Sequence, residues 1–336
     1  MSWILVAIIS YFLIALEIIL DKFLLSSKRV SHPAIYAFYS GLLSLAALAI
    51  FFPFGFHSIS FAKIWPYLLA GAVFTYGILN LFFALNKSEA SKVTPVAGAV
   101  IPIVTFFLSI FFLDERLGKI QIIGVIVLIL GGLLISFDLP IGVNPITLSR
   151  INKFFPIHFL NSLIFVKGDG ASKQKVFAGF WHTILAGILL AAAFTAFKHF
   201  FERDNFINVF IWTRLGLFLG ALSLLFFPLW RQAIVASLKK FKKPRQGETR
   251  TGVLFVVNKC LGGTGSILAN YAISLGSVII VNALVSVEYI FVFLFGLLFS
   301  FWLPKVFEER GAFWDVAQKI GAIIIITFGI ILISLK

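Results

Sequence analysis

The sequence has almost no cysteine and very little charge for its length. Cys260 is the single cysteine among 336 residues, so no disulfide can form within the chain. Charged residues make up 12% of the chain, whereas soluble domains contain about 25%. Hydrophobic residues make up 60%, and 41 residues are Phe. This composition excludes a water-soluble globular protein, because only lipid can cover so much apolar surface.

Residue patterns typical of metal sites, nucleotide hydrolysis and nucleic-acid binding are also missing from the sequence. The five His residues have no spacing typical of metal ligands. The glycine-rich residues 261–266 lie in an apolar run and lack the Lys that follows a phosphate-binding loop. We therefore expect no cofactor and no ATP-driven activity. The net charge of +14 fits basic residues that flank membrane spans, and we expect no nucleic-acid partner.

Ten stretches are long and apolar enough to cross a bilayer, which needs about 20 residues per helix. They are residues 3–21, 33–54, 63–85, 93–113, 119–137, 177–197, 206–229, 251–272, 277–303 and 318–335. Their apolar character is continuous, without the alternation of a membrane β-barrel. Because backbone polar groups must be satisfied internally in lipid, the stretches predict helices. The expected fold class is an all-α membrane protein with ten transmembrane helices.

The predicted spans form two groups of five. Residues 1–137 hold the first group, residues 177–336 hold the second, and residues 138–176 form a polar linker. The partly apolar middle of the linker, residues 151–166, predicts a segment that lies in the membrane interface. Residues 231–250 form a very basic connection, which predicts a cytoplasmic anchor, with contact to anionic lipid as an alternative.

The two groups of spans carry the same landmarks in the same order. The matched positions are Gly41 and Gly216, Gly77 and Gly265, Glu115-Arg116 and Glu309-Arg310, Gly124 and Gly321, and Gly131 and Gly329. An odd number of spans per group gives the second group the opposite orientation. The sequence therefore predicts two inverted five-helix repeats, an arrangement typical of secondary transporters that bind a solute between their halves.

Most of the 28 Lys and Arg residues lie at one end of the predicted spans. This end holds the loops between spans 1–2, 3–4, 5–6, 7–8 and 9–10. The positive-inside rule places these loops in the cytoplasm and both termini on the other side. The expected location is therefore a multi-pass protein of a plasma or inner membrane, in this orientation.

Residues 95–137 contain a distinctive series of residues: Pro95 and Pro102, Asp114-Glu115-Arg116-Leu117, Gln121, Gly124 and Gly131-Gly132. This series resembles the EamA-type repeat of the drug/metabolite transporter superfamily. The second half keeps Gln318, Gly321 and Gly329 but lacks both prolines. The resemblance implies a transporter fold with cytoplasmic termini, opposite to the orientation that charge predicts. It leaves the solute open, since the superfamily carries amino acids, sugars, nucleotide-sugars, drugs and other metabolites.

Four ionisable residues lie well inside predicted spans: Glu17, Arg214, Lys259 and Glu288. Each costs about 2.5–3.5 kcal/mol at the centre of a membrane helix. We therefore expect all four to face the interior of the bundle and to pair. Lys259 and Glu288 are expected to lie within reach of each other. For Glu17, pairing with Lys22 or Lys259 competes with a role in proton binding.

Span eight carries a polar stripe. Lys259, Gly263, Ser266 and Asn270 are spaced so that they share one side of a helix. Lys259 is a candidate anchor for a carboxylate or phosphate, and Ser266 and Asn270 are candidate substrate-binding residues. The neighbouring glycines can equally be explained by close helix packing.

Further candidates lie on other spans. Tyr76 and Asn80 are placed around Lys259 as substrate-binding residues, because span three corresponds to span eight in the repeat. Glu288 is the sixth substrate-binding candidate. The candidates for coupling or gating are Glu17, Arg214, Pro95 and Pro102.

These features predict a secondary transporter rather than an enzyme. We expect a small organic solute, such as a metabolite, an amino acid or a drug-like molecule, to cross the lipid bilayer by alternating access. Coupling to protons or another ion is compatible with the sequence, which leaves the oligomeric state open. The alternatives are a structural or regulatory membrane protein that transports nothing and an intramembrane enzyme that acts on lipids.

Overall fold

The computed structural model describes residues 2–25, 32–51, 53, 60–87, 90–136, 165–166, 175–176, 178–241, 248–302 and 313–335. Helices hold nearly all of these residues, which confirms the all-helical class. Two short strands, β1 (Phe165–Val166) and β2 (Lys175–Val176), pair antiparallel in the linker. The expected interfacial segment 151–166, apart from β1, and the residues Glu309-Arg310 lie outside the described residues.

The described residues of the first half form six α-helices. They are α1 (Ser2–Leu25), α2 (Pro33–Leu43), α3 (Leu45–Phe51), α4 (Phe61–Lys87), α5 (Ala90–Phe112) and α6 (Lys119–Ser136). The second predicted span is thus not one continuous helix, because α2 ends before Ser44. The Ser44 hydroxyl bonds to the carbonyl oxygens of Gly41, at 2.6 Å, and Arg214, at 3.0 Å. Hydroxyls that bond back to the preceding turn often bend helices.

The described residues of the second half form seven α-helices and one 3-10 helix. They are α9 (Phe180–Phe201), α10 (Phe206–Ser223), η2 (Leu224–Phe226), α11 (Pro228–Phe241), α12 (Glu248–Leu275), α13 (Val278–Ala283), α14 (Val285–Trp302) and α15 (Phe313–Ser334). The predicted span 206–229 ends early, since Pro228 begins α11, a position that suits proline. Part of the basic connection 231–250 is therefore helical. The predicted span 277–303 is divided between α13 and α14.

Six helical stretches in the described residues are long and apolar enough to cross a membrane. They are Trp3–Leu20, Phe61–Lys87, Phe180–Phe201, Phe206–Phe226, Val278–Gly296 and Ala317–Ser334. Val96–Phe112 and Lys119–Ile135 are apolar but shorter. Large hydrophobic side chains such as Leu5, Phe111 and Ile324 are exposed on the outside of the bundle, where lipid can cover them. The chain is an integral, multi-pass membrane protein.

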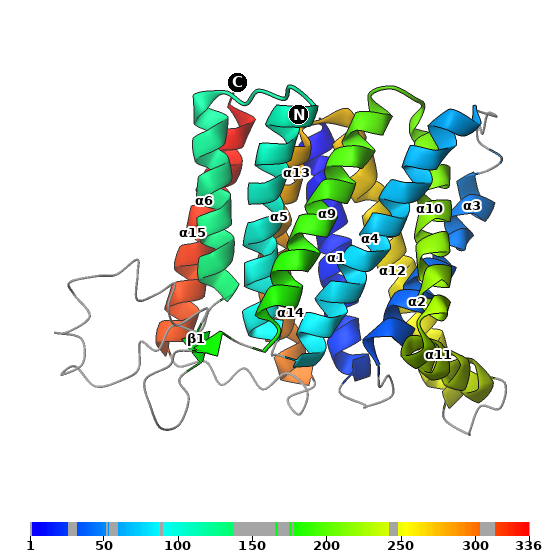
Figure 1. The fold of residues 1–336 in the computed structure, drawn as a ribbon. Coiled ribbons are helices and arrows are strands. Elements are labelled where there is room, and N and C mark those ends of the chain that lie inside the picture. The colour runs from blue at the N-terminus through cyan, green and yellow to red at the C-terminus, as the bar shows by residue number, and fades with distance from the viewer. Residues whose placement is uncertain are drawn as a thin grey trace.

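The long helices run side by side, and both termini lie at the same end of the bundle (Figure 1). Helix α1 packs against α12 and α14, whereas α9 packs against α4 and α5. Helix α6 packs against α15, and α10 packs against α2 and α4. Helix α11 lies at the end of the bundle away from the termini (Figure 1). Residues from the two halves of the chain are therefore neighbours throughout the bundle.

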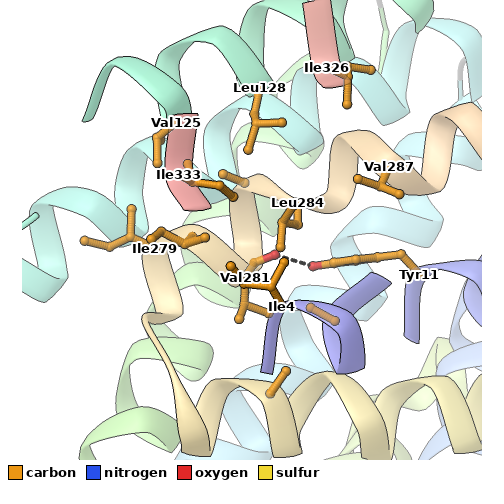
Figure 2. Packing of buried hydrophobic residues seen from close by; sticks show 14 of the residues in the cluster. Ile4, Tyr11, Val125, Leu128, Ile279, Val281, Leu284, Val287, Ile326 and Ile333 are labelled. Atoms are coloured by element: carbon orange, nitrogen blue, oxygen red, sulfur yellow. Dashed lines mark hydrogen bonds between the residues drawn. The ribbon is translucent and has the colours of Figure 1, made fainter. Parts of the chain in front are cut away.

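The largest hydrophobic cluster among the described residues joins α1, α6, α12, α13, α14 and α15 (Figure 2). Leu128, Ile279, Leu284 and Ile326 are fully buried there. The Tyr11 hydroxyl of α1 donates a hydrogen bond of 2.8 Å to the carbonyl oxygen of Val281. This carbonyl is one of the last in α13, where helix geometry leaves carbonyls without partners. The Val281 carbonyl, close to the break between α13 and α14, thus has a hydrogen-bond partner on another helix, α1.

Two matched glycines allow α6 and α15 to approach closely. A Cβ atom at Gly131 would lie 2.6 Å from the side chain of Ile326, and one at Gly329 would lie 2.9 Å from that of Leu128. Small residues at such crossings are typical of membrane helix packing. The glycine pattern that repeats in the sequence thus belongs, at these two positions, to one helix interface.

Candidate functional site

An ion pair joins the two halves of the chain inside the bundle. The Lys259 Nζ atom of α12 lies 2.6 Å from the Glu17 Oε1 atom of α1. Their side chains are 12% and 19% exposed, so both are largely removed from the surface. The Lys259 ammonium group also lies 4.8 Å from the centre of the Tyr36 ring on α2, a cation–π distance. Lys259 thus has an acidic and an aromatic partner.

The predicted pair between Lys259 and Glu288 is wrong. Helix α1 packs against both α12, which carries Lys259, and α14, which carries Glu288. The prediction assumed that spans adjacent in sequence are adjacent in space. Because α1 supplies Glu17 next to α12, the lysine is neutralised from the first half instead. Pairing of Glu17 with Lys259 was one of the two pairings that the sequence favoured.

The Glu17 carboxylate lies against the backbone of α12 because residue 262 is glycine. A Cβ atom at Gly262 would overlap the carboxylate. One turn further along, the Ser10 hydroxyl donates a hydrogen bond of 2.8 Å to the carbonyl oxygen of Gly265. Close helix packing therefore explains these two glycines. A Cβ atom added at Gly263, on the predicted polar stripe, would meet no neighbouring atom within 4 Å.

Arg214 is buried in the middle of α10 and is 7% exposed. Its Nη2 atom donates to the Ser266 hydroxyl of α12 over 3.3 Å, and its guanidinium carbon lies 4.4 Å from the centre of the Phe210 ring. The Nε atom is buried without an acceptor. Within the described residues, no carboxylate forms an ion pair with this arginine. Arg214 thus carries a buried charge that the described protein groups do not neutralise.

Glu288 lies in the first turn of α14 and is 8% exposed. Glu17 and Tyr11 lie near enough to interact with it electrostatically. Across the described part of the chain, Glu288 makes no ion pair and no hydrogen bond through its side chain. All four ionisable residues that the sequence placed inside the spans therefore lie in the interior of the bundle.

Lys259 and the contact of Arg214 with Ser266 lie at different positions along the axis of α12. Ser266, the partner of Arg214, comes seven residues after Lys259, which is about 10 Å along a helix axis. Asn270 follows on the same side, is 2% exposed, and donates 2.8 Å to the carbonyl oxygen of Ser266. The predicted stripe of Lys259, Ser266 and Asn270 is therefore a polar face of α12 with charged partners from α1 and α10.

Tyr76 and Asn80 do not join this group. The Tyr76 hydroxyl is 2.7 Å from the Ser223 hydroxyl of α10, and Asn80 Nδ2 donates 2.9 Å to the Tyr76 carbonyl oxygen. His182 Nδ1 lies 3.1 Å from Asn80 Oδ1, and His182 Nε2 lies 2.8 Å from Lys87 Nζ. Because an ammonium group can only donate, Nε2 accepts and Nδ1 carries the proton. These residues bind α4 to α9 and α10.

Pro95 and Pro102 both lie within α5, which continues through them as one helix. Pro102 is buried and has no N–H group to bond with the carbonyl of Gly98. The Tyr289 hydroxyl, from the residue after Glu288, donates 3.1 Å to the carbonyl oxygen of Thr94 and packs over Gly98. The proline-containing part of α5 is thus held by the helix turn that carries Glu288.

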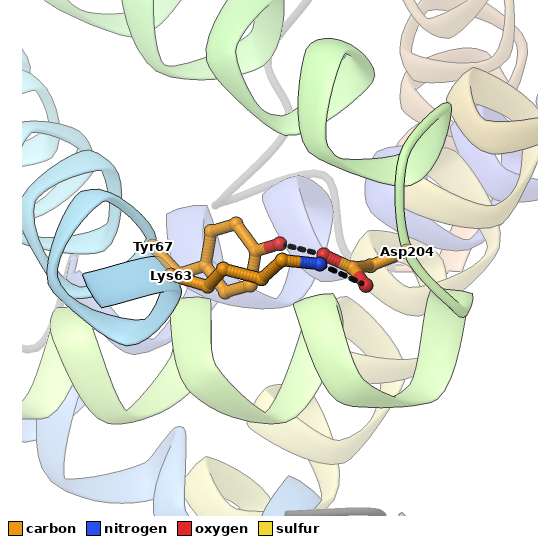
Figure 3. Close-up of polar contacts among 3 residues, drawn as sticks. All are labelled: Lys63, Tyr67 and Asp204. Atoms are coloured by element: carbon orange, nitrogen blue, oxygen red, sulfur yellow. Dashed lines mark hydrogen bonds and ion pairs between the residues drawn. The ribbon is translucent and has the colours of Figure 1, made fainter. Parts of the chain in front are cut away.

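Sequence reasoning missed a polar contact at the end of the bundle that holds the termini (Figure 3). Lys63 Nζ of α4 lies 3.4 Å from Asp204 Oδ1, in the loop between α9 and α10. The Tyr67 hydroxyl donates to the other carboxylate oxygen of Asp204. The sequence could have predicted this contact, because it places a basic residue and an acidic residue at the same end of two spans. Nothing in the sequence predicts that Tyr36 contacts Lys259 or that Gly262 makes room for the Glu17 carboxylate.

The described residues contain no cluster of three or more His, Cys, Asp or Glu side chains that could hold a metal ion. The charged groups described inside the bundle are instead the ion pair of Glu17 with Lys259, Arg214 with its hydroxyl partner, and Glu288. Such an arrangement can bind and orient a charged small molecule or carry a proton.

Residues 1–137 match the model of the EamA-like transporter family, which belongs to the drug/metabolite transporter superfamily. A stretch of 77 residues is 40% identical to an uncharacterized protein of Methanocaldococcus jannaschii, covering 23% of this chain and 56% of that protein. The chain thus spans about half the length of this curated relative. A protein crystal structure is similar with a TM-score of 0.63 and 16% identity, covering 99% of this chain and 98% of the other. That similarity concerns the fold alone.

Proposed function

We propose, on the premise that residues 1–137 belong to the EamA-like transporter family, that this protein is a secondary transporter. It carries a small organic solute across the membrane by alternating access and is not an enzyme. The solute binds between the two halves of the chain, around the polar face of α12. Movement of the halves against each other exposes the site first to one side of the membrane and then to the other.

The proposed architecture is ten spans in two inverted repeats of five. The helix contacts support it, because they come in exchanged pairs. Helix α1 of the first half packs against α12 and α14, while its counterpart α9 packs against α4 and α5. The counterparts α6 and α15 pack against each other, as do α2 and α10. Contacts of this kind are expected when a twofold axis relates the halves.

The observation that carries the proposal is the ion pair between Glu17 and Lys259 inside a bundle that lipid surrounds. Ionised groups at membrane depth are costly and are found mainly where they bind substrates or ions. Glu17 comes from the first half and Lys259 from the second, so the pair is a contact that relative movement of the halves can break. A solute or a proton that competes for either residue would bias that movement.

Roles follow for the remaining candidates. Ser266 and Asn270 contribute hydrogen bonds to the solute from the face of α12. Glu17 and Glu288 are the acids that can exchange protons for ion coupling. Pro102 removes one backbone hydrogen bond from α5, which eases bending of that helix. Tyr76 and Asn80 hold α4 against α9 and α10 rather than bind the solute.

The test is transport by the purified full-length chain in liposomes. A thermal-shift screen against pools of metabolites identifies a stabilising solute, since a ligand that binds only the folded state raises its stability. Counterflow of this solute is then measured for the wild type and for Lys259→Ala. We expect counterflow in the wild type and a marked loss in the variant. Unchanged kinetics in Lys259→Ala would remove Lys259 from the site, and absence of counterflow for every stabilising solute would favour a non-transporting membrane protein.

A further inference from the structure

Lys259 and Arg214 differ in whether a carboxylate of the described residues pairs with them. Lys259 has the Glu17 carboxylate at 2.6 Å and the Tyr36 ring beside it. Arg214 has a hydroxyl at 3.3 Å and the Phe210 ring, and within the described ranges no carboxylate is paired with it. A buried charge without a counter-charge is costly, because desolvation is not offset by attraction to an opposite charge.

The guanidinium group of Arg214 also retains unused donors. It has five N–H bonds, of which the Ser266 hydroxyl accepts one. The Nε–H group is buried without any acceptor. Such a group costs the full desolvation penalty unless an acceptor from outside the chain completes it. Arg214 therefore has an unmet charge and unmet hydrogen bonds at the same place, 7% exposed in the middle of α10.

We infer that the transported solute is a small organic monocarboxylate whose carboxylate binds to the guanidinium group of Arg214. This inference rests on the proposed transport function and specifies its substrate. The planar guanidinium matches a carboxylate through two parallel hydrogen bonds. Ser266 and Asn270 lie on the facing side of α12 and supply further hydrogen bonds. The solute anchor is thus Arg214, and Lys259 serves the contact between the halves.

The charge balance favours a carboxylate over a phosphate. Lys259 has Glu17 as an acidic partner, whereas no carboxylate in the described residues forms an ion pair with Arg214, so the single positive charge of Arg214 faces the solute. A carboxylate brings one negative charge, whereas a phosphate ester brings about 1.5 to 2. A phosphate would therefore bring more negative charge into the interior than the Arg214 guanidinium can neutralise.

The test compares acids with neutral molecules of the same shape. Thermal unfolding of the purified full-length protein is measured with benzoate, hexanoate and N-acetyl-leucine, each paired with its amide, and with phenyl phosphate. We expect at least one carboxylate to raise the unfolding temperature with saturable concentration dependence, and its amide and phenyl phosphate to have little effect. Arg214→Gln should weaken the carboxylate by about tenfold or more, the range for hydrogen bonds to a charged group.

Two further variants keep the result interpretable. Arg203→Gln makes the same change at an exposed position in the loop after α9 and should bind the carboxylate like the wild type. Arg214→Lys keeps the charge but loses the paired hydrogen bonds, and should weaken binding less than Arg214→Gln. If Arg214→Gln does not fold, unchanged affinity in Arg214→Lys decides against the inference. Equal stabilisation by amides, a preference for phenyl phosphate, or no stabilisation by any carboxylate also overturns it.

Counterflow separates this inference from the proposed function. Transport of a neutral or cationic solute, with no carboxylate carried, leaves the transport function standing and removes the monocarboxylate assignment. Binding of a carboxylate through Arg214 without any flux would confirm the carboxylate site but remove the transport function, because the site would then belong to a protein that does not transport.

Discussion

Gly262 has no side chain, so the Glu17 carboxylate can lie directly against the backbone of α12. Adding one methyl group at residue 262 tests whether this close contact contributes to stability. Gly262→Ala would place a Cβ atom on the Glu17 carboxylate and displace it from Lys259. We expect a loss of about 1–3 kcal/mol in the free energy of unfolding, the range for overpacking a tight interior. Unfolding in detergent by SDS titration measures the change.

Gly263→Ala is the matched control, because the added methyl group meets nothing within 4 Å. It should be neutral or raise stability by about 0.4–1 kcal/mol through the unfolded chain. In a Glu17→Ala background, Gly262→Ala should lose most of its effect. If both glycine variants change the free energy of unfolding alike in the wild-type background, the contact of Glu17 with Gly262 does not contribute to stability.

Replacing one residue of the Glu17–Lys259 ion pair is expected to lower the free energy of unfolding more than replacing both. Glu17→Gln removes the carboxylate that lies 2.6 Å from the Lys259 ammonium group, whose side chain is 12% exposed. Loss of one partner of a buried pair costs about 3–5 kcal/mol, whereas replacing both by apolar groups is often neutral. The double variant Glu17→Met with Lys259→Met should therefore unfold with a free energy closer to that of the wild type. SDS titration of the wild type, Glu17→Gln and the double variant checks this order, and a double variant less stable than Glu17→Gln would argue against direct coupling.

The sequence predicts which residues point inward but not how they pair. A charge inside an apolar span is visible in the sequence, and lipid forces it into the bundle. All four such residues are interior in the structure. Pairing depends on which helices are neighbours, and α1 takes the place beside α12 that the prediction gave to α14. Arg214 lacks an acidic partner in the described structure, a property that the sequence could not reveal.

At the scale of elements, the loop between α5 and α6 contains an acid with a shifted pKa. Burial raises the pKa of the Glu115 carboxyl above its ordinary value, against smaller opposing effects of Ser277 and Lys198. The native state thus binds this proton more tightly than the unfolded chain does. The associated stability is fully present below the unfolded pKa and is lost as the pH rises through the native pKa.

Glu115→Gln should remove this pH dependence, because a glutamine cannot ionise. We expect the unfolding temperature of the wild type to fall from about pH 4 to about pH 8 by more than that of the variant. Near pH 8 the variant should be the more stable of the two. Thermal unfolding at a series of pH values measures both curves, and parallel curves would show that Glu115 does not contribute.

The broken elements are where prediction from hydropathy fails. The sequence predicts one helix for residues 33–54 and one for 277–303, but Ser44 and Leu284 separate each into two. Helix α12 carries so many polar and small residues that it is missing from the six spans that length and composition select. The substrate-site hypothesis depends on this same helix. Polar residues that serve a binding site reduce the very signal that identifies a membrane span.

At the scale of the whole molecule, the sequence supports two opposite orientations. The charge distribution places the end with α11 in the cytoplasm, whereas the resemblance to the superfamily places the termini there. Charge acts on insertion directly, so we expect the end with α11 to be cytoplasmic. Figure 1 shows that α11 and the termini lie at opposite ends of the bundle, so one position at each end decides.

The single cysteine makes the orientation measurable. In a Cys260→Ser background, Arg203→Cys reports on the end that holds the termini, and Arg231→Cys reports on the end that holds α11; both residues are exposed. Arg203→Cys should react with a membrane-impermeant maleimide in intact cells, and Arg231→Cys only after the membrane is opened. The reverse pattern would place the termini in the cytoplasm. Since Lys259 lies nearer the α11 end of α12 than Ser266 does, the result also tells which face of the membrane the ion pair is closer to.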